Sequence, residues 1–157
     1  MPRTGRSLGL QGYLMFAVFD LDGTLMMCEH RRHHLAGPKP NFHKFNSACV
    51  DDEPCAPLVA LISSLQTTGW RVELWSARED RYLAHTMVWL SMNEVWVGRE
   101  QLRMRPAGDY RPDEVLKEEW LLSLSVRPDI VFDDRRKVVD MWRRNGITCA
   151  QMAPGEF

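Results

Sequence analysis

The sequence predicts an α/β protein built on a doubly wound, Rossmann-like parallel sheet. Short apolar runs of the kind that form buried strands alternate with segments whose apolar residues recur at helical spacing. Such an alternation forms β–α units, whose parallel strands pair in one sheet that helices cover on both faces. Two of the predicted strands end in acidic residues, at Asp20 and at Asp133. Ligands of open α/β sheets bind beyond the carboxyl ends of the strands, so we expect the functional site there.

The predicted elements follow one another along most of the chain. The first strand is the apolar run Leu14–Phe19. A helix is predicted over Pro57–Leu65, because proline is well tolerated in a first helical turn. The last helix, Lys137–Arg144, is followed by Asn145–Gly146, a typical helix stop. Between and after these lie predicted strands at Arg71–Trp75, Gln101–Met104, Asp129–Phe132 and Ile147–Ala150, and helices at Arg81–Leu90 and Pro112–Leu124.

Size and composition fit one domain. The chain has 157 residues, 45% of them apolar, which is enough for a core at this length. We expect a domain over residues 14–157, preceded by a flexible tail over residues 1–13.

Twenty basic against 21 acidic residues give a net charge of −1, which argues against binding nucleic acid by bulk charge but allows a local basic patch.

The location expected from the sequence is cytoplasmic. No apolar run approaches the length of a membrane span, so we expect no membrane association. The start of the chain lacks the long apolar core of a signal peptide. The cysteines form no CxxC pair and match no zinc ribbon, and reduced thiols are the better interpretation. They are Cys28, Cys49, Cys55 and Cys149.

The segment from His30 to Val50 has an unusual composition. It contains no acidic residue, four basic residues and four of the five histidines. A zinc site is disfavoured, because no cysteine lies at finger spacing and the order of the histidines is not HExxH. We therefore expect a basic flap or small helical lid beside the site.

Acidic residues at two strand ends predict a cation site. Asp20 and Asp22 follow the first strand, and Asp133 and Asp134 follow a later one. Parallel strands end at the same edge of the sheet, so all four carboxylates are expected near one another, where their repulsion calls for a cation. Ligands that are all oxygen suit a hard ion, and Mg²⁺ is the natural one for phosphate chemistry. For a single aspartate, turn or capping chemistry is the competing interpretation.

The pentapeptide Asp20-Leu21-Asp22-Gly23-Thr24 resembles the first motif of the haloacid-dehalogenase superfamily. Three further matches follow in order: Ser76 at a strand end, Lys117, and the pair Asp133-Asp134. The resemblance implies a phosphatase fold of that type, here with a minimal cap, because the spacers leave no room for a large cap domain.

A narrower resemblance covers about Leu14 to Phe157. Five segments are similar to the phosphatase half of phage polynucleotide kinase/phosphatases. They are Ser76-Ala77-Arg78, the segment 113–119, Asp133-Asp134-Arg135, the segment 138–144 and the last five residues. No GxxxxGK[ST] motif is present, so the kinase half is not in this sequence. The segment 41–57 departs from the phage pattern.

The resemblance assigns a role to each motif. Asp20 is implied as the nucleophile that becomes an aspartyl phosphate, and Asp22 as the general acid and base. Asp20, the backbone carbonyl of Asp22 and one or both of Asp133 and Asp134 would hold Mg²⁺. Ser76 would hydrogen-bond a phosphoryl oxygen, and Lys117 would neutralise charge on the transferring group.

Four further residues complete the predicted site. Arg31 and Arg78 match arginines of the phage enzymes, and a guanidinium fork suits phosphate contacts. Thr24 and Asp113 are also assigned to substrate binding: Thr24 as a cap after the turn, and Asp113 as a group that orients Lys117 one helical turn later. Trp96, in an irregular stretch, is a candidate for stacking on a base.

The expected substrate is a 3′-phosphate on a DNA or RNA end, since an open site admits the end of a polymer. Two alternatives stay open at this point. One is a nucleotidase that acts on free mononucleotides. The other is a binding module that has kept the fold and lost activity. The sequence does not indicate an oligomeric state or a kinase or ligase partner.

Overall fold

Five parallel strands form the central sheet of the computed structural model, which describes residue 12 and residues 15–155. The strand order is β5–β4–β1–β6–β7, and every neighbouring pair is parallel, as predicted. β1 therefore lies in the middle of the sheet, between β4 and β6. The strands are β1 (Phe16–Phe19), β4 (Arg71–Glu79), β5 (Leu102–Arg105), β6 (Ile130–Asp133) and β7 (Thr148–Gln151).

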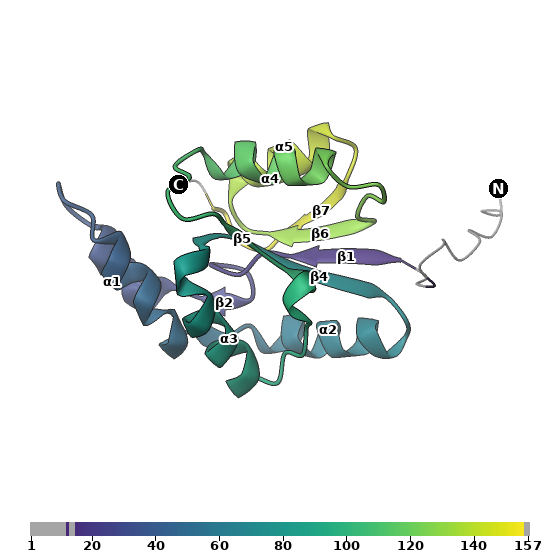
Figure 1. The fold of residues 1–157 in the computed structure, drawn as a ribbon, viewed down its shortest axis with the longest axis horizontal. Coiled ribbons are helices and arrows are strands. Elements are labelled where there is room, and N and C mark those ends of the chain that lie inside the picture. Colours follow the sequence, from purple (N-terminus) through teal and green to yellow (C-terminus); the bar gives the residue numbers. More distant parts are fainter. Residues whose placement is uncertain (1–11, 13–14, 156–157) are drawn as a thin grey trace.

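Helices cover both faces of the sheet, which confirms the predicted doubly wound α/β class. α2 (Ala56–Thr67) and α3 (Leu83–Met92) lie on one face, and α4 (Asp113–Leu122) and α5 (Arg136–Arg144) on the other (Figure 1). No described helix combines the length and the apolar character needed to cross a membrane.

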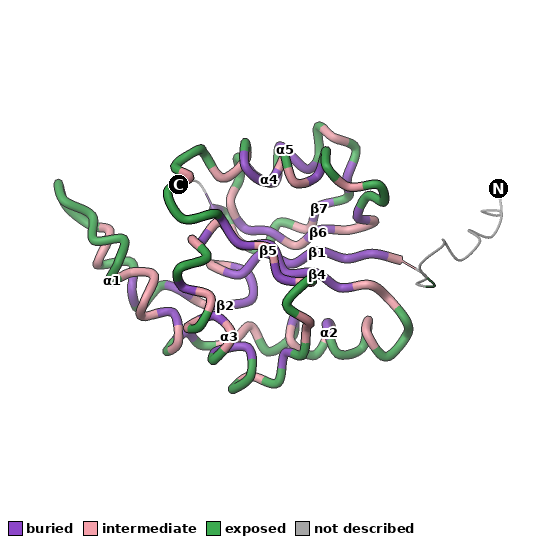
Figure 2. The backbone as a smooth tube through the Cα atoms, viewed as in Figure 1, coloured by how far each residue is buried: buried purple, intermediate pink, exposed green. Residues whose placement is uncertain are grey.

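The core is divided into two layers by the sheet. Successive side chains of a strand point to opposite faces. Ala17 and Phe19 of β1 accordingly pack in the cluster under α2 and α3, whereas Phe16 and Val18 pack with the buried residues of α4 and α5. The central strands are buried along their length, while the outer helix faces are exposed (Figure 2). Two buried layers hold the strand ends, and hence the site, in a fixed position.

Most element boundaries lie within two residues of the predicted ones, and β4 differs more. The strand predicted over Arg71–Trp75 continues to Glu79, because its register against β5 shifts between Ser76 and Glu79 and pairing resumes at Arg105. Of the predicted tail 1–13, only Gly12 is among the described residues.

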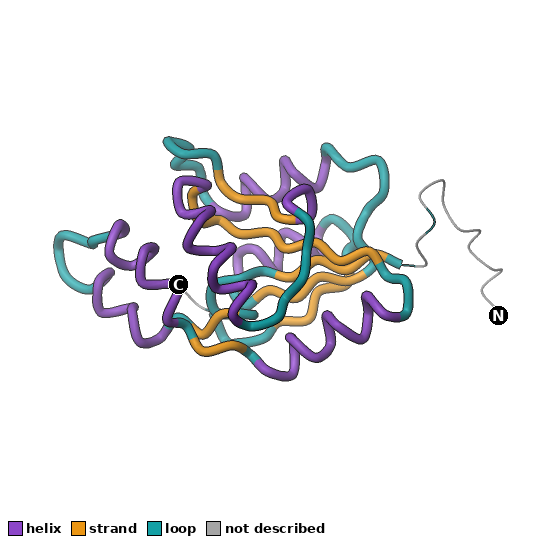
Figure 3. Tube along the Cα trace, turned by 60° about the horizontal axis from the view of Figure 1, so that its bottom comes forward, coloured by secondary structure: helices purple, strands orange, loops and turns teal. Residues whose placement is uncertain are grey.

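A small lid follows β1, as the length of the spacer predicts. It consists of β2 (Met26–Met27), the 3₁₀ turns η1 (Glu29–Leu35) and η2 (Ala48–Asp51), α1 (Phe42–Ser47) and β3 (Glu53–Pro54), which pairs with β2. Figures 1 and 3 show this segment projecting beyond the end at which the strands of the sheet terminate. The lid therefore flanks the carboxyl edge of the sheet.

Candidate active site

Three buried carboxylates meet at the carboxyl edge of the central strands. Asp20 follows β1, whose Phe19 is paired with Phe132 of β6, so Asp133 and Asp134 lie beside it. Each of the three side chains offers an oxygen within 4.8 Å of the others. Within the described part of the chain, this is the one group of acidic, histidine and cysteine side chains that could hold a metal ion.

Lys117 of α4 reaches into the same cluster. Its Nζ donates to Asp20 Oδ1 at 2.7 Å and to Asp133 Oδ2 at 2.9 Å. Burial alone would lower the pKa of Lys117, but Asp133 and Asp20 outweigh it and raise that pKa. Burial and the neighbouring Asp133 raise the pKa of Asp20 well above its ordinary value, in spite of the ammonium group. The cluster therefore contains one fixed positive charge and three carboxylates.

The remaining imbalance fits a divalent cation. Asp134 Oδ2 is buried and has no hydrogen-bond partner, which is a costly state for a carboxylate oxygen. Burial and Asp133 raise the pKa of Asp134 as well. Three oxygen donors with one orphaned oxygen are the ligands that a hard ion prefers. Asp20, Asp133 and Asp134 are thus the residues that would hold the ion.

Gly23 makes room for this cluster. Its φ is +81°, and a Cβ at this position would lie 2.3 Å from Asp134 Oδ2. The next residue, Thr24, is fully buried, and its hydroxyl lies 3.4 Å from Asp20 Oδ2 and 3.3 Å from Asp134 Oδ1. The glycine and threonine of the motif therefore shape the acidic cluster directly.

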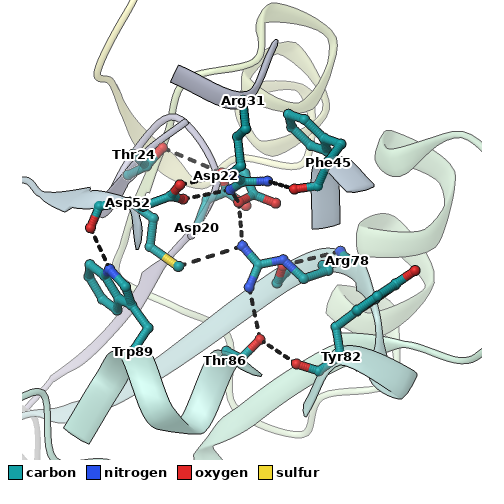
Figure 4. Close-up of polar contacts among 12 residues, drawn as sticks. Asp20, Asp22, Thr24, Arg31, Phe45, Asp52, Arg78, Tyr82, Thr86 and Trp89 are labelled. Atoms are coloured by element: carbon teal, nitrogen blue, oxygen red, sulfur yellow. Dashed lines mark hydrogen bonds and ion pairs between the residues drawn. The ribbon is translucent and has the colours of Figure 1, made fainter. Parts of the chain in front are cut away.

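The carboxylate of Asp22 lies apart from the other three, contrary to the expectation that all four gather. The chain turns immediately after Asp20, with the backbone N–H groups of Thr24, Leu25 and Met26 all donating to Leu21 O, so the extended geometry that would align Asp20 with Asp22 does not form. The Asp22 side chain instead accepts ion-paired hydrogen bonds from Arg31 and Arg78 (Figure 4). Burial would raise the pKa of Asp22, but the two arginines outweigh it and lower that pKa.

Arg31 lies behind Asp22 and is fully buried. Its Nε donates to Asp52 Oδ1 at 2.7 Å, its Nη1 to Phe45 O at 3.0 Å, and its Nη2 to both Asp22 and Asp52. Each guanidinium nitrogen therefore has a protein acceptor, and in this conformation Arg31 holds Asp22 in place.

Arg78 approaches Asp22 from the other side and lines the pocket. Its Nη1 donates to Thr86 Oγ1 at 2.8 Å, and its Nη2 to Asp22. The Thr86 hydroxyl in turn donates to Tyr82 O at 3.0 Å, so α3 anchors the arginine (Figure 4).

Asp52 is a site residue that the sequence reasoning missed. It is buried and binds Arg31 through both oxygens, while His30 Nε2 lies 2.7 Å from its Oδ1. Trp89 Nε1 donates to its backbone carbonyl at 2.7 Å, which fixes the lid to α3. The sequence holds one signal that could have found it. An arginine assigned to the site needs acidic partners, and Asp51–Asp52 are the first acids after the acid-free segment that contains Arg31.

Ser76 and Asp113 both make contacts with the protein, and those of Asp113 differ from the one expected. Ser76 Oγ is buried and accepts from the backbone N–H of Arg78 at 3.1 Å. Asp113 pairs with Arg105, whose Nη2 lies 2.6 Å from Oδ1, and with Arg135, rather than with Lys117. Lys117 is oriented by Asp20 and Asp133 instead, and Asp113 fixes two arginines at the wall of the pocket.

An open pocket of about 840 Å³ leads to the acidic cluster. Asp20, Lys117, Asp133 and Asp134 lie in its lining together with Arg78. Segments of the lid, of the loop between β5 and α4, and of the start of α5 form its walls. Its size is within the range of pockets that hold small organic ligands. Trp96 is exposed, but it does not line this pocket.

Comparison with known proteins gives a family match over nearly the whole chain. Residues 15–157 match the model of the polynucleotide kinase PNKP phosphatase domain. The match includes each motif residue from Asp20 to Asp134.

Chains in two solved structures of Pnkp1/Rnl/Hen1 complexes are similar to this one. One of these, described as an RNA repair complex, has 28% identity and a TM-score of 0.77 over 99% of this chain and 47% of its own. The other has 31% identity and a TM-score of 0.74 over 90% of this chain and 46% of its own. This chain thus spans about half the length of those chains. A class C acid phosphatase from Bacillus anthracis, with 13% identity and a TM-score of 0.64 over 93% of this chain and 72% of its own, shares the fold.

Proposed function

The chain belongs to the family of polynucleotide kinase PNKP phosphatase domains, and from this membership we propose that it is a Mg²⁺-dependent phosphomonoesterase that removes 3′-phosphates from DNA or RNA ends. One observation carries the proposal. Asp20 lies at the base of an open pocket, in a buried cluster with Lys117 and two further carboxylates, one of which has an orphaned oxygen. This arrangement supplies a nucleophile and the means of neutralising a phosphate.

Asp20 is the proposed nucleophile. Its carboxylate attacks phosphorus, the bond from phosphorus to the sugar oxygen breaks, and an aspartyl phosphate forms. Lys117, 2.7 Å from Asp20, offsets negative charge on the transferring group. Bound Mg²⁺ would neutralise the charge that otherwise repels the attacking carboxylate. Water then attacks phosphorus and releases inorganic phosphate with Asp20 regenerated.

Asp22 is the proposed general acid and base. It protonates the departing sugar oxygen and accepts a proton from the attacking water. Arg31 and Arg78 lower the pKa of Asp22 in the free protein, which disfavours the protonated form needed for the first step. We propose that a phosphate dianion competes for Arg78, whose release from Asp22 raises that pKa when substrate is bound. Arg31, held by Asp52, remains as the positioning residue.

The openness of the site supports a polymer substrate. The pocket has a small lid in place of a large cap domain, and several of its wall residues are basic. The similarity to chains of RNA repair complexes supports a role in nucleic-acid repair, in which removal of the 3′-phosphate leaves a 3′-hydroxyl for joining.

Steady-state turnover on matched substrates tests the proposal. Oligonucleotides of DNA and of RNA with a 3′-phosphate, the same oligonucleotides with a 5′-phosphate, and free 3′- and 5′-mononucleotides are compared with Mg²⁺ and with EDTA. We expect the highest kcat/KM on the 3′-phosphorylated oligonucleotides, no turnover in EDTA, and none with Asp20→Asn. A preference for free mononucleotides would establish the nucleotidase instead. Equal, negligible turnover by the wild type and Asp20→Asn on all substrates would favour a binding module.

A further inference from the structure

Two large aromatic side chains stand exposed at the walls of the pocket. Tyr110, in the loop between β5 and α4, is 85% exposed, and Phe42, the first residue of α1, is 62% exposed. Both line the pocket that leads to Asp20. Single exposed apolar residues are common, but here two aromatic rings from segments far apart in sequence border one cavity.

The backbone around Tyr110 is held firmly. The buried Arg105 donates from Nη1 to the carbonyls on either side of this residue, to Asp109 O at 2.9 Å and to Arg111 O at 2.7 Å. Its Nε donates to Ala77 O at 2.7 Å, which ties the loop to the end of β4. The exposed ring is therefore presented by a fixed loop, so little backbone freedom is lost when a ligand covers the ring.

Phe42 is held in a similar way. The Asn41 side chain caps α1 by accepting from Lys44 N at 2.9 Å, and Asn41 N donates to His34 O at 2.8 Å. His43 Nδ1 lies 3.0 Å from the Tyr82 hydroxyl, so the start of α1 is attached to the body of the protein. Both rings thus stand on anchored backbone while their faces remain open.

We propose that Tyr110 and Phe42 form a stacking platform for the nucleobase of the 3′-terminal nucleotide, whose phosphate lies at Asp20. The inference rests on the proposed function and gives it a substrate determinant. A base stacks on an aromatic face without regard to its identity, so the platform recognises a nucleotide end rather than a sequence. Lys137, which is exposed and also lines the pocket, is available for the next backbone phosphate.

The first test compares two 3′-phosphorylated oligonucleotides that differ only in whether the terminal residue carries a base or is abasic. For Tyr110→Ala and for Phe42→Ala we expect kcat/KM on the normal oligonucleotide to fall about tenfold or more, and to be unchanged on the abasic one. Tyr110→Phe should keep the wild-type value. Trp96→Ala is the matched control, because Trp96 is 67% exposed but does not line the pocket.

The second test needs no turnover. A fluorescent adenine analogue at the 3′ terminus should be quenched on binding to Asp20→Asn, and Tyr110→Ala or Phe42→Ala added to that variant should reduce the quenching. Two results would overturn the proposal of a stacking platform. One is an equal loss of kcat/KM on the normal and the abasic oligonucleotide, and the other is quenching that neither substitution reduces. If the wild type turns over neither oligonucleotide, the proposed function fails, while the quenching still decides whether a base stacks here.

Discussion

Asp52 binds Arg31 through both carboxylate oxygens, at 2.7 Å from Nε and 2.6 Å from Nη2, and both side chains are shielded from solvent. A buried arginine that lost one of its two carboxylate partners would keep an uncompensated charge. Asp52 therefore stabilises the lid and, through Arg31, holds Asp22.

We predict that Asp52→Asn lowers the free energy of unfolding by about 3 kcal/mol, the typical cost of breaking a buried ion pair. It should also lower kcat on a phosphate ester at least tenfold, because Asp22 loses its support. Urea unfolding and steady-state kinetics measure the two effects. Asp51→Asn is the matched control, since Asp51 is the exposed neighbour in sequence. An Asp52→Asn protein with the urea midpoint and kcat of the control would show that the pair has no such role.

The acidic cluster predicts a gain of stability on metal binding. Mg²⁺ should raise the melting temperature of the wild type, because it binds only the folded cluster. Asp134→Asn should raise the melting temperature in EDTA, since it removes a buried charge whose Oδ2 has no partner, and it should abolish most of the gain from Mg²⁺. Asp140→Asn, on the exposed side of α5, serves as the control. If Mg²⁺ stabilises the Asp134→Asn and Asp140→Asn proteins equally, Asp134 is not a ligand.

The pH dependence of the metal-free protein follows from the same cluster. Burial raises the pKa of Asp20 and of Asp134 above the ordinary value of 3.8, so the folded state binds these protons more tightly than the unfolded state. Their contribution to the free energy of unfolding is therefore wholly present at pH values below the ordinary pKa. It is lost as the pH rises through the raised pKa values.

In EDTA, the stability of the wild type relative to Asp134→Asn should decline as pH rises from about 4 towards neutrality. Urea midpoints of the two proteins across this range provide the measurement. With saturating Mg²⁺, the urea midpoint of the wild type should decline less over this pH range than it does in EDTA, or not at all. A relative stability that rises with pH in EDTA would contradict the sign of the shift.

Gly23 provides a test of crowding at the cluster. Gly23 and Gly69 both have positive φ, +81° and +84°, so alanine at either position carries backbone strain of about 1 kcal/mol. Only at Gly23 would the new Cβ meet Asp134 Oδ2, at 2.3 Å, whereas nothing lies within 4 Å at Gly69. We predict that Gly69→Ala lowers the stability and leaves kcat and Mg²⁺ binding unchanged, whereas Gly23→Ala lowers the stability, lowers kcat and weakens Mg²⁺ binding. Full activity in Gly23→Ala would show that the cluster tolerates displacement.

Much of the fold was predictable from the sequence, because strand and helix periods are local signals. The run before Asp20 is apolar because both faces of β1 are buried, and the strand–helix alternation requires a parallel sheet. The extension of β4 to Glu79 was not predictable, since it depends on a register shift against β5. The lid elements are likewise short and depend on contacts such as the bond from Trp89 to Asp52.

The candidate site was predictable in its residues more than in its contacts. The resemblance of the motifs identified Asp20, Lys117 and Asp133, which the structure brings together. The spacing of two residues between Asp20 and Asp22 indicated a common direction, but the turn at Gly23 sends the second carboxylate to the arginines. Pairings between distant residues, such as Arg31 with Asp52, are set by packing and leave no periodic signal.

The identity of the nucleophile is the claim on which the proposed chemistry depends most. An oligonucleotide with a radiolabelled 3′-phosphate can be mixed with the Mg²⁺-loaded protein and quenched in acid within a single turnover. We predict label on the protein, in the peptide that contains Asp20, with none retained by Asp20→Asn. Release of labelled phosphate by the wild type without any protein-bound label at early times, or label on a peptide that lacks Asp20, would contradict the assignment.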